Sequence, residues 1–212
     1  MDFLHACLVV DVSEREDNKQ NVLPVGHVGV ELVMDVFECI AARRSVRDYD
    51  ARRIPRDVVE KILDAAVCAP SAMHVLPWKF IIIEDQEKLK DLDARVKKAY
   101  GLLGKAISVA FLKGKTVFHN APLIILIVCE KSGSWFREDS ALAAENAFLA
   151  ARALGVGSCF IGMAHRLNDK EEDLQAAGVP KGHKIFAALA FGYPRGEWPK
   201  GEKRSPKIVS WT

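Results

Sequence analysis

The feature that most constrains the fold is an unbroken apolar run over residues 123–129, within the segment PLIILIVCE. Its length suits a β-strand, and its lack of polar alternation predicts a strand that is buried on both faces of a sheet. Such a sheet needs covering layers on each side. The chain is therefore expected to fold around this strand, with its other elements arranged above and below it.

Helical and strand patterns alternate on either side of this run, without internal repeats. Apolar spacing predicts helices over residues 34–44, 53–71, 85–100 and 138–155. The last helix is rich in alanine, has Gly155 as its expected C-cap, and should lie in a core or across a subunit interface. Further strands are expected at residues 78–84, 155–163, 183–194 and 206–212. At 212 residues the chain has room for one sizeable core, so the pattern indicates one α+β domain on a small sheet.

Residues 1–33 differ from the rest of the chain. An apolar stretch over residues 3–12 is followed by the polar segment SEREDNKQN and then by PVGHVGVELV. The stretch is too short to span a bilayer and has no basic flank, so neither a membrane anchor nor a signal peptide is expected. We expect residues 1–33 to form an N-terminal extension or arm, and residues 34–212 to form the main domain.

Composition narrows the classes of function. Charged residues make up 27% of the chain and the net charge is +2, which is typical of a globular domain and disfavours a nucleic-acid partner. The five cysteines show no CxxC pair and no Cys/His spacing typical of zinc. Neither a metal site nor a disulfide framework is expected, and reduced thiols in a cytoplasmic protein are the favoured interpretation.

The first candidate site is the basic segment that ends the first predicted helix. Arg43, Arg44 and Arg47 surround Ser45 in the segment ARRSVRDYD. Cations are favoured at a helix C-terminus, so these residues fit a capped, solvated basic face. They also fit a site for a dianion, because guanidinium groups match phosphate oxygens. Both interpretations stay open on charge alone.

Three further segments are candidates for ligand binding. The proline-bounded loop CAPSAMHVLPWKF carries Ser71 and His74 beside a buried strand, a common place for a binding loop. Glycines in GVGSCFIGMA allow backbone to approach a flat ligand, but the segment lacks GxGxxG and follows a helix, which disfavours a Rossmann site. The carboxy-terminal tail carries Lys203 and Arg204, which also fit a solvated basic tail.

Together, the order and spacing of these segments resemble the FMN-dependent nitroreductase family, which includes NAD(P)H-dependent flavin oxidoreductases. The family's R-x-S-x-[RK] segment is matched by residues 43–47, and its A-P-S-x-x-N-x-Q-P-W motif by residues 69–78. A strand opening with A-P, an alanine-rich helix ending in A-L-G-x-G-S-C, a G-Y-P triplet and a final [KR]-R-x-P element follow in order. The resemblance covers residues 34–212, and the ordered set is specific although no single motif is.

The resemblance implies a three-layer fold with a small mixed, mainly antiparallel sheet flanked by helices. It also implies an intertwined homodimer with FMN at the subunit interface. The implied FMN-binding positions are Arg43, Arg44, Ser45, Arg47, Pro70, Ser71, Ala72, His74, Ile161, Gly162, Met163, Lys203 and Arg204. The two basic segments would hold the phosphate and ribityl chain, and Arg47 would stabilise negative charge at the pyrimidine edge of reduced flavin. The 70–74 loop would line the ring, and the backbone of Gly162 and Met163 would lie near N5 and O4.

Two positions depart from the family pattern, because His74 and Leu76 stand where Asn and Gln are usual. Asparagine donates and accepts along the flavin's pyrimidine edge, whereas histidine can change its charge near neutral pH and leucine forms no hydrogen bond. We expect flavin binding with altered contacts and altered redox tuning.

The implied reaction is ping-pong and needs no catalytic side chain. NADH or NADPH delivers hydride to flavin N5, and a nitroaromatic, quinone or similar small acceptor then takes it. Trp135 and Phe136 would stack on the acceptor or pack at an interface, and residues 101–120 would form a lid. The alternatives are a flavin-binding sensor or storage module without turnover, a reductive dehalogenase, and an anion-binding protein with surface basic clusters.

Overall fold

The computed structural model describes residues 9–10, 34–101, 112, 114–202 and 204–211. Its sheet consists of β1 (Val9–Val10), β2 (Lys79–Ile83), β3 (Leu123–Glu130), β4 (Gly157–Phe160) and β5 (His183–Gly192). Their order across the sheet is β1-β2-β3-β5-β4, and each neighbouring pair is antiparallel. A parallel bridge joins Ser45 to Ser158 of β4. The expected small, mainly antiparallel sheet is therefore confirmed.

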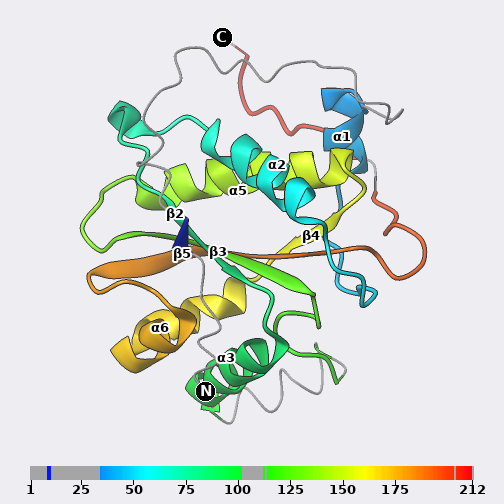
Figure 1. The fold of residues 1–212 in the computed structure, drawn as a ribbon. Coiled ribbons are helices and arrows are strands. Elements are labelled where there is room, and N and C mark those ends of the chain that lie inside the picture. The colour runs from blue at the N-terminus through cyan, green and yellow to red at the C-terminus, as the bar shows by residue number, and fades with distance from the viewer. Residues whose placement is uncertain (1–8, 11–33, 102–111, 113, 203, 212) are drawn as a thin grey trace.

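Helices cover both faces of the sheet (Figure 1). One face carries α1 (Val36–Ala42), α2 (Arg56–Val67) and α5 (Phe136–Ala153), and the other carries α3 (Gln86–Ala99) and α6 (Glu171–Ala177). Two 3₁₀ segments complete the frame, η2 (Ala72–His74) before β2 and η4 (Gly162–Asp169) after β4. The predicted three-layer α+β architecture is confirmed.

The apolar run at residues 123–129 forms most of β3, the middle strand of the sheet. Its residues from Leu123 to Cys129 are each at most 1% exposed. Alternate side chains enter different cores, with Leu123 and Ile125 packing on the α2 and α5 side and Ile124 and Leu126 on the α3 and α6 side. The prediction of a strand buried on both faces is confirmed.

Helix ends follow from the residues that flank them. Asp35 and Asp85 precede α1 and α3, and each side chain accepts two backbone N–H groups of the first turn. The alanine-rich helix α5 ends at Ala153 with Leu154 as its C-cap, and Gly155 follows with a φ of +72°. That left-handed conformation favours glycine, so Gly155 ends the helix one residue beyond the C-cap position at which it was expected.

Several parts of the chain leave large apolar side chains uncovered, among them α1 and the tail. On α1, Phe37 is 79% exposed and its neighbours Val36 and Ile40 are also exposed. In the tail, Val209 and Trp211 are exposed as well. The strand predicted at residues 206–212 is wrong, since residues 204–211 form no strand. β4 is an edge strand of the sheet, and its outer edge is contacted by residues 45–46 and not by the tail.

Of the amino-terminal residues 1–33, the structure describes only β1. Val9 and Val10 pair with Ile81 and Phe80, so β1 extends the sheet at the free edge of β2. The rest of the predicted arm, residues 1–8 and 11–33, lies outside the described residues.

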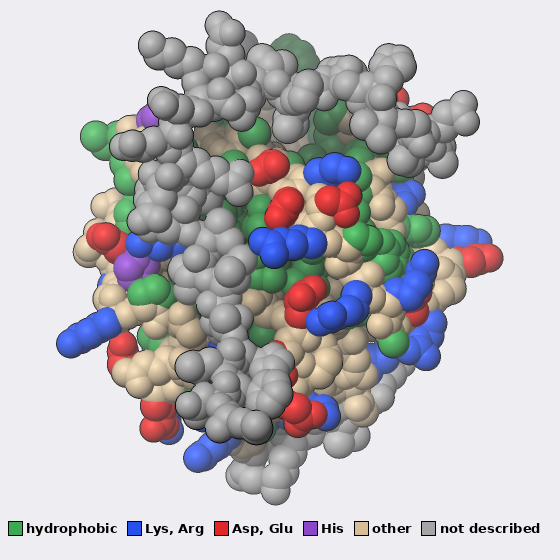
Figure 2. Space-filling model, in the orientation of Figure 1, with side chains coloured by type: hydrophobic (Ala, Val, Ile, Leu, Met, Phe, Trp, Pro, Cys, Tyr) green, Lys and Arg blue, Asp and Glu red, His purple; other side chains and the backbone are tan. Residues whose placement is uncertain are grey.

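Surface charge is mixed on the face that Figure 2 shows, where acidic and basic side chains alternate. On α2, for example, Arg56 pairs with Glu60 and Lys61 with Asp57. Among the described residues, no helix is long and apolar enough to cross a membrane, and no group of three or more potential ligands is placed to hold a metal ion. Three of the four described cysteines are buried thiols, and Cys68 is exposed.

Candidate functional site

The basic segment leaves the end of α1 and runs beside β4. The backbone N–H of Val46 donates to the Ser158 carbonyl at 2.9 Å, which holds residues 45–46 against the strand. Arg44 Nη1 donates to the carbonyls of Ala41 and Arg43 at 2.7 and 2.6 Å, so this guanidinium caps α1. The capping interpretation of this segment is therefore confirmed for Arg44, whose remaining guanidinium donors stay available to an anion.

Arg43 is anchored differently, by charge. Its Nε lies 3.0 Å from Glu145 Oε1 on α5, in a geometry that places the ions together without forming a well-directed hydrogen bond. The half-buried guanidinium is thus held at a fixed place on α5 by an ion pair. Anchoring of this kind preorganises a cation for a ligand at little entropic cost when the ligand binds.

The carboxy-terminal tail passes directly over this basic segment. A Cβ at Gly201 would overlap the guanidinium of Arg44, so the tail lies directly against the end of that side chain, which would have to move to accommodate a larger residue. Arg204 follows three residues later and is exposed, whereas Lys203 lies outside the described residues. The structure therefore brings the tail to Arg44, which the sequence prediction of converging basic clusters required.

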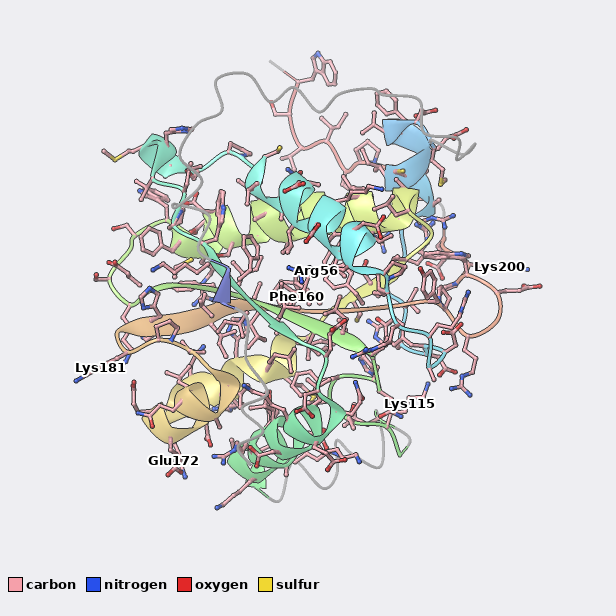
Figure 3. All side chains as sticks on the ribbon, viewed as in Figure 1. Arg56, Lys115, Phe160, Glu172, Lys181 and Lys200 are labelled. Carbon is pink, nitrogen blue, oxygen red and sulfur yellow. The ribbon has the colours of Figure 1, made fainter. Side chains whose placement is uncertain are left out.

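Arg47 lies at the other end of the segment, next to the turn at residues 114–120. Lys115 Nζ donates to the Arg47 carbonyl at 3.0 Å and pairs with Asp48 at 2.9 Å. Burial, followed by the charges of Arg47 and Lys115, lowers the pKa of His119 to about 4, so its imidazole is neutral at pH 7. Figure 3 shows Lys115 and Lys200 on the same side of the molecule, which is the side of α1 in Figure 1.

Burial raises the pKa of the Cys159 thiol in the same region, and Arg47 opposes that effect. Burial likewise raises the pKa of Tyr49, whose hydroxyl donates to the Val46 carbonyl at 2.6 Å. Both groups stay protonated at neutral pH. They pack the inner side of the basic segment, and its positive charge faces outward.

The predicted binding loop, residues 70–76, has a strained backbone. Met73, His74 and Leu76 have φ values of +55°, +56° and +49°, which are uncommon for residues with a side chain. The Ser71 hydroxyl accepts the Leu76 N–H at 2.9 Å and closes the loop across its base. Strained backbone that is held in place is typical of ligand-binding loops.

Asp139 fixes this loop to the first turn of α5, and the sequence argument did not identify it. Its Oδ1 accepts the backbone N–H of Ala72 at 3.0 Å, while its buried Oδ2 has no hydrogen-bond partner among the described residues. The side chain is only 3% exposed. The one signal in the sequence is an acidic residue in the first turn of a long helix, which by itself indicates no more than a favourable helix dipole.

The glycine segment lies where β4 ends. Ile161 is buried and its N–H donates to the Ala188 carbonyl at 2.8 Å, so the backbone leaves the sheet there and enters η4. Gly162 is exposed, and a Cβ at that position would meet open space. Met163 packs partly against the core. The backbone at residues 162–163 is therefore accessible at the end of the strand that the basic segment follows.

The predicted site residues fall into two groups along α5. The basic segment touches α5 at Glu145 and the 70–76 loop touches it at Asp139, six residues earlier. That separation is about 9 Å along the helix. Figure 1 shows α1 and the teal turn of residues 72–74 at opposite ends of α5. Within one chain, residues 43–45 and the tail lie beside β4. The 70–76 loop lies at a different place along α5.

We call the first group the arginine half: residues 43–47, residues 161–163 and the tail at residues 201–204. The second group, the loop half, comprises residues 70–76 with Asp139 of α5, which holds them. Trp135 is exposed at the start of α5, next to the loop half, while Phe136 turns inward onto Phe186. Most of the predicted lid, residues 102–111 and 113, lies outside the described residues.

The chain is similar to several known proteins. The sequence model of the Nitroreductase family matches residues 40–193. An archaeal relative from Methanothermobacter thermautotrophicus, whose name combines NADH dehydrogenase with NAD(P)H nitroreductase, is 34% identical over 76% of this chain and 78% of its own. An iodotyrosine deiodinase from Thermotoga neapolitana is 29% identical over 78% of this chain and 91% of its own.

A solved structure supports the same assignment at the level of the fold. A nitroreductase from Bacteroides fragilis, determined with bound FMN, is 33% identical and superposes with a TM-score of 0.73. The match covers 84% of this chain and 98% of that one. The fold is therefore that of an FMN-dependent α+β oxidoreductase. The chain belongs to the nitroreductase family.

Proposed function

We propose that the protein is an FMN-dependent oxidoreductase that takes hydride from NADH or NADPH and reduces a small acceptor such as a nitroaromatic or quinone. The observation that carries the proposal is the arginine half, in which Arg44, the tail at Gly201 and the open backbone of Gly162 are gathered around β4. Family membership and the FMN-bound relative support the choice of flavin.

The residues present fit a flavin mononucleotide. Its phosphate is a dianion, and Arg43 and Arg44 would supply anchored guanidinium donors for it. Ser45 would add a hydroxyl partner, and Arg204 and Lys203 of the tail would add further cations. The strained 70–76 loop supplies a rigid surface for a flat ring. The orphaned Asp139 Oδ2, buried beneath that loop, indicates that the loop's inner face is completed by a group from outside the described chain.

When bound, FMN supplies a site that accepts a hydride and returns it to a second substrate. The chain's own residues bind and orient. Arg47 would hold a permanent positive charge for the pyrimidine edge of the ring, where reduction adds negative charge. The accessible N–H groups of Gly162 and Met163 would orient the reactive edge of the ring. Neutral His119 adds no competing charge next to Arg47.

The site is completed by a second copy of the chain. The arginine half and the loop half contact α5 at different places. We infer that each ligand is held by the arginine half of one chain and the loop half of another, as in the homodimer that the family resemblance implies. Uncovered Phe37 on α1 and Trp211 in the tail supply apolar surface for such an interface. A two-fold homodimer would form two equivalent sites, each with the arginine half of one subunit and the loop half of its partner.

Absorption spectroscopy tests the cofactor first. The purified protein should carry, or take up, one FMN per chain, and NADH or NADPH should bleach it without oxygen. A quinone, a nitroaromatic or a halogenated tyrosine would then restore the colour if it is an acceptor. Bleaching without reoxidation by any of them would favour a flavin store, the alternative function. A protein that binds no FMN would contradict both.

Complementation tests whether the site is shared. Chains carrying Arg43→Ala and Arg44→Ala lack the arginine half, and chains carrying Ala72→Trp lack the loop half. Each homodimer should bind little FMN, but mixed dimers should recover one site in two, because one interface then contains both intact halves. Mixed dimers that bind no more FMN than the parents would place each site within a single chain.

A further inference from the structure

Outside the candidate site, a cavity opens at the end of the sheet where β5 begins. It has a volume of about 360 Å³ and lies between the loop that follows β3, the first turn of α5, the start of β5 and η4. Figure 3 marks this end of the sheet with Lys181, which comes just before β5. Small-molecule sites in proteins begin at about 300 Å³, so the cavity has room for a substituent of a substrate.

The walls of this cavity are rigid. Asn168 Nδ2 donates to the Ile185 carbonyl at 2.8 Å, and its Oδ1 accepts the Ile185 N–H at 2.9 Å. Phe186 packs edge to face on Phe136, with ring centroids 6.3 Å apart. The side-chain amide of Asn168 thus replaces a neighbouring strand along β5, and the cavity is preformed.

Cationic side chains dominate the charged lining. Lys131, Arg137 and Lys184 line the cavity, against one carboxylate from Glu138. Lys131 is already paired with Glu171 at 2.9 Å. The side chains of Arg137 and Lys184 form no hydrogen bond or ion pair with any described residue, while their backbones belong to α5 and β5. Two cations therefore remain for an anion, and the guanidinium of Arg137 can bind a carboxylate or phosphate through two donors.

His165 connects this cavity to the proposed hydride site. It lines the cavity and lies three residues after Gly162 in η4, a rise of about 6 Å in a 3₁₀ helix. Its ring stacks near Phe160 with centroids 6.5 Å apart. Burial, and then the charge of Arg137, lowers the pKa of His165, which favours its neutral form, so the charge offered to an anion comes from Arg137 and Lys184.

We propose that this cavity binds the anionic substituent of the compound that reacts at the flavin, through Arg137 and Lys184. The proposal rests on the proposed function, because it places the cavity one helical turn from the reactive edge of the ring. The anion is a carboxylate on an aromatic acceptor or a phosphate of the nicotinamide donor. Either anion would bind the guanidinium of Arg137 in the same way. The donor reacts in the reductive half-reaction and the acceptor in the oxidative one, so kinetics can distinguish them.

Stopped-flow kinetics of each half-reaction tests the proposal with Arg137→Gln and Lys184→Gln. If the anion belongs to the acceptor, reoxidation by 4-nitrobenzoate should slow about tenfold, the effect of losing one charge-assisted contact, while reoxidation by nitrobenzene is unchanged. If it belongs to the donor, reduction by NADPH should slow about tenfold and both acceptors should react normally. Lys90→Gln on α3 removes one charge elsewhere and should change neither half-reaction.

Equal rates for wild type and both variants in every half-reaction would overturn the proposal. A wild-type protein that holds FMN but transfers no hydride would overturn the proposed function instead. The cavity is then tested by calorimetric titration of the FMN-loaded protein with 4-nitrobenzoate and with NADPH. Binding that weakens about tenfold in Arg137→Gln supports the anion site, and binding that is absent or unchanged rejects it.

Discussion

The two halves of the candidate site are built by opposite means. In the arginine half the backbone is relaxed, and the side chains are charged and anchored by Glu145, by the α1 carbonyls and by the tail. In the loop half no residue from 70 to 76 carries a permanent charge, Met73, Val75 and Leu76 expose apolar side chains, and the backbone itself is strained at Met73, His74 and Leu76. Asp139 holds that strain in place from below.

This difference indicates a division of work. A charged, anchored half supplies most of the affinity for an anionic ligand, because charge-assisted contacts are the strong ones. A strained, neutral half supplies shape and orientation, which affect affinity less and the properties of the bound ring more. Substitutions in the two halves should therefore separate into changes of binding and changes of geometry.

The largest effect is expected in the arginine half. Arg43→Ala or Arg204→Ala removes charge-assisted hydrogen bonds of about 1.5–3 kcal/mol, so the Kd for FMN should rise roughly 10- to 150-fold. Fluorescence titration of the apoprotein with FMN measures it. Arg56→Ala on α2, which breaks a surface ion pair with Glu60, is the matched control and should leave the Kd unchanged. An unchanged Kd in both site variants would place the phosphate elsewhere.

Asp139→Ala is expected to remove the hydrogen bond that holds the 70–76 loop to α5. The Ala72 N–H loses its buried acceptor, so the free energy of unfolding should fall by about 1–3 kcal/mol. Urea denaturation measures that loss, and Glu172→Ala, an exposed carboxylate on α6, should have little effect. Full stability in Asp139→Ala would mean that the strained loop is held by other contacts.

Acid should destabilise the arginine half through His119. Its folded-state pKa of about 4 lies below the ordinary value of 6.5, so the neutral form is favoured by folding. The stability it contributes is complete above pH 6.5 and is lost as pH falls towards about 4. Urea midpoints between these values should decline less in His119→Asn, since asparagine also tolerates the φ of +57°. Parallel declines in both proteins would assign the loss to other groups.

A smaller change is expected from His74→Asn, which restores the residue usual in the family. One added neutral hydrogen bond of about 0.5–1.5 kcal/mol should lower the Kd for FMN by roughly two- to tenfold. The flavin reduction potential should shift by about 10–30 mV at most. Potentiometric titration measures the shift, with His183→Asn as a control at the start of β5. An increase in Kd would show that histidine makes the better contact in this loop.

The smallest effect is expected from a chain that begins at Met34. Neither half contains residues before α1, so FMN binding and dimerisation should persist without the arm. The described part of the arm, β1, pairs with β2 at the far edge of the sheet from β4. Loss of flavin or of the dimer, measured by absorbance and light scattering, would show that residues 1–33 belong to the site.

The spacing of apolar residues predicted most helices and strands, because whether a segment forms a helix or a strand depends largely on its own residues. The run at residues 123–129 could only be a buried strand, and the alanine-rich helix ended at Gly155 as its residues indicate. The tail at residues 206–212 has the same apolar character but forms no strand. A strand needs a free edge to pair with, and no local pattern records whether that edge is already contacted by residues 45–46.

The supports of the site were beyond prediction for a related reason. Asp139 acts on Ala72 across 67 positions of sequence, and Gly201 meets Arg44 through a close approach that only three-dimensional packing reveals. Likewise, the apolar spacing of α1 predicts a buried face, yet Phe37 and Ile40 are exposed within one chain. Their burial would require a second chain, which a single sequence does not display.

The position of the two halves at separate points on α5 also has a consequence for how the protein behaves on dilution. If each ligand is gripped by two chains, association of the chains and retention of the ligand are linked by mass action. The fraction of flavin retained should then fall as the protein is diluted, even at a fixed ratio of flavin to chain. Free flavin should in turn draw monomers together, so the cell's supply of cofactor would set how much assembled enzyme it holds.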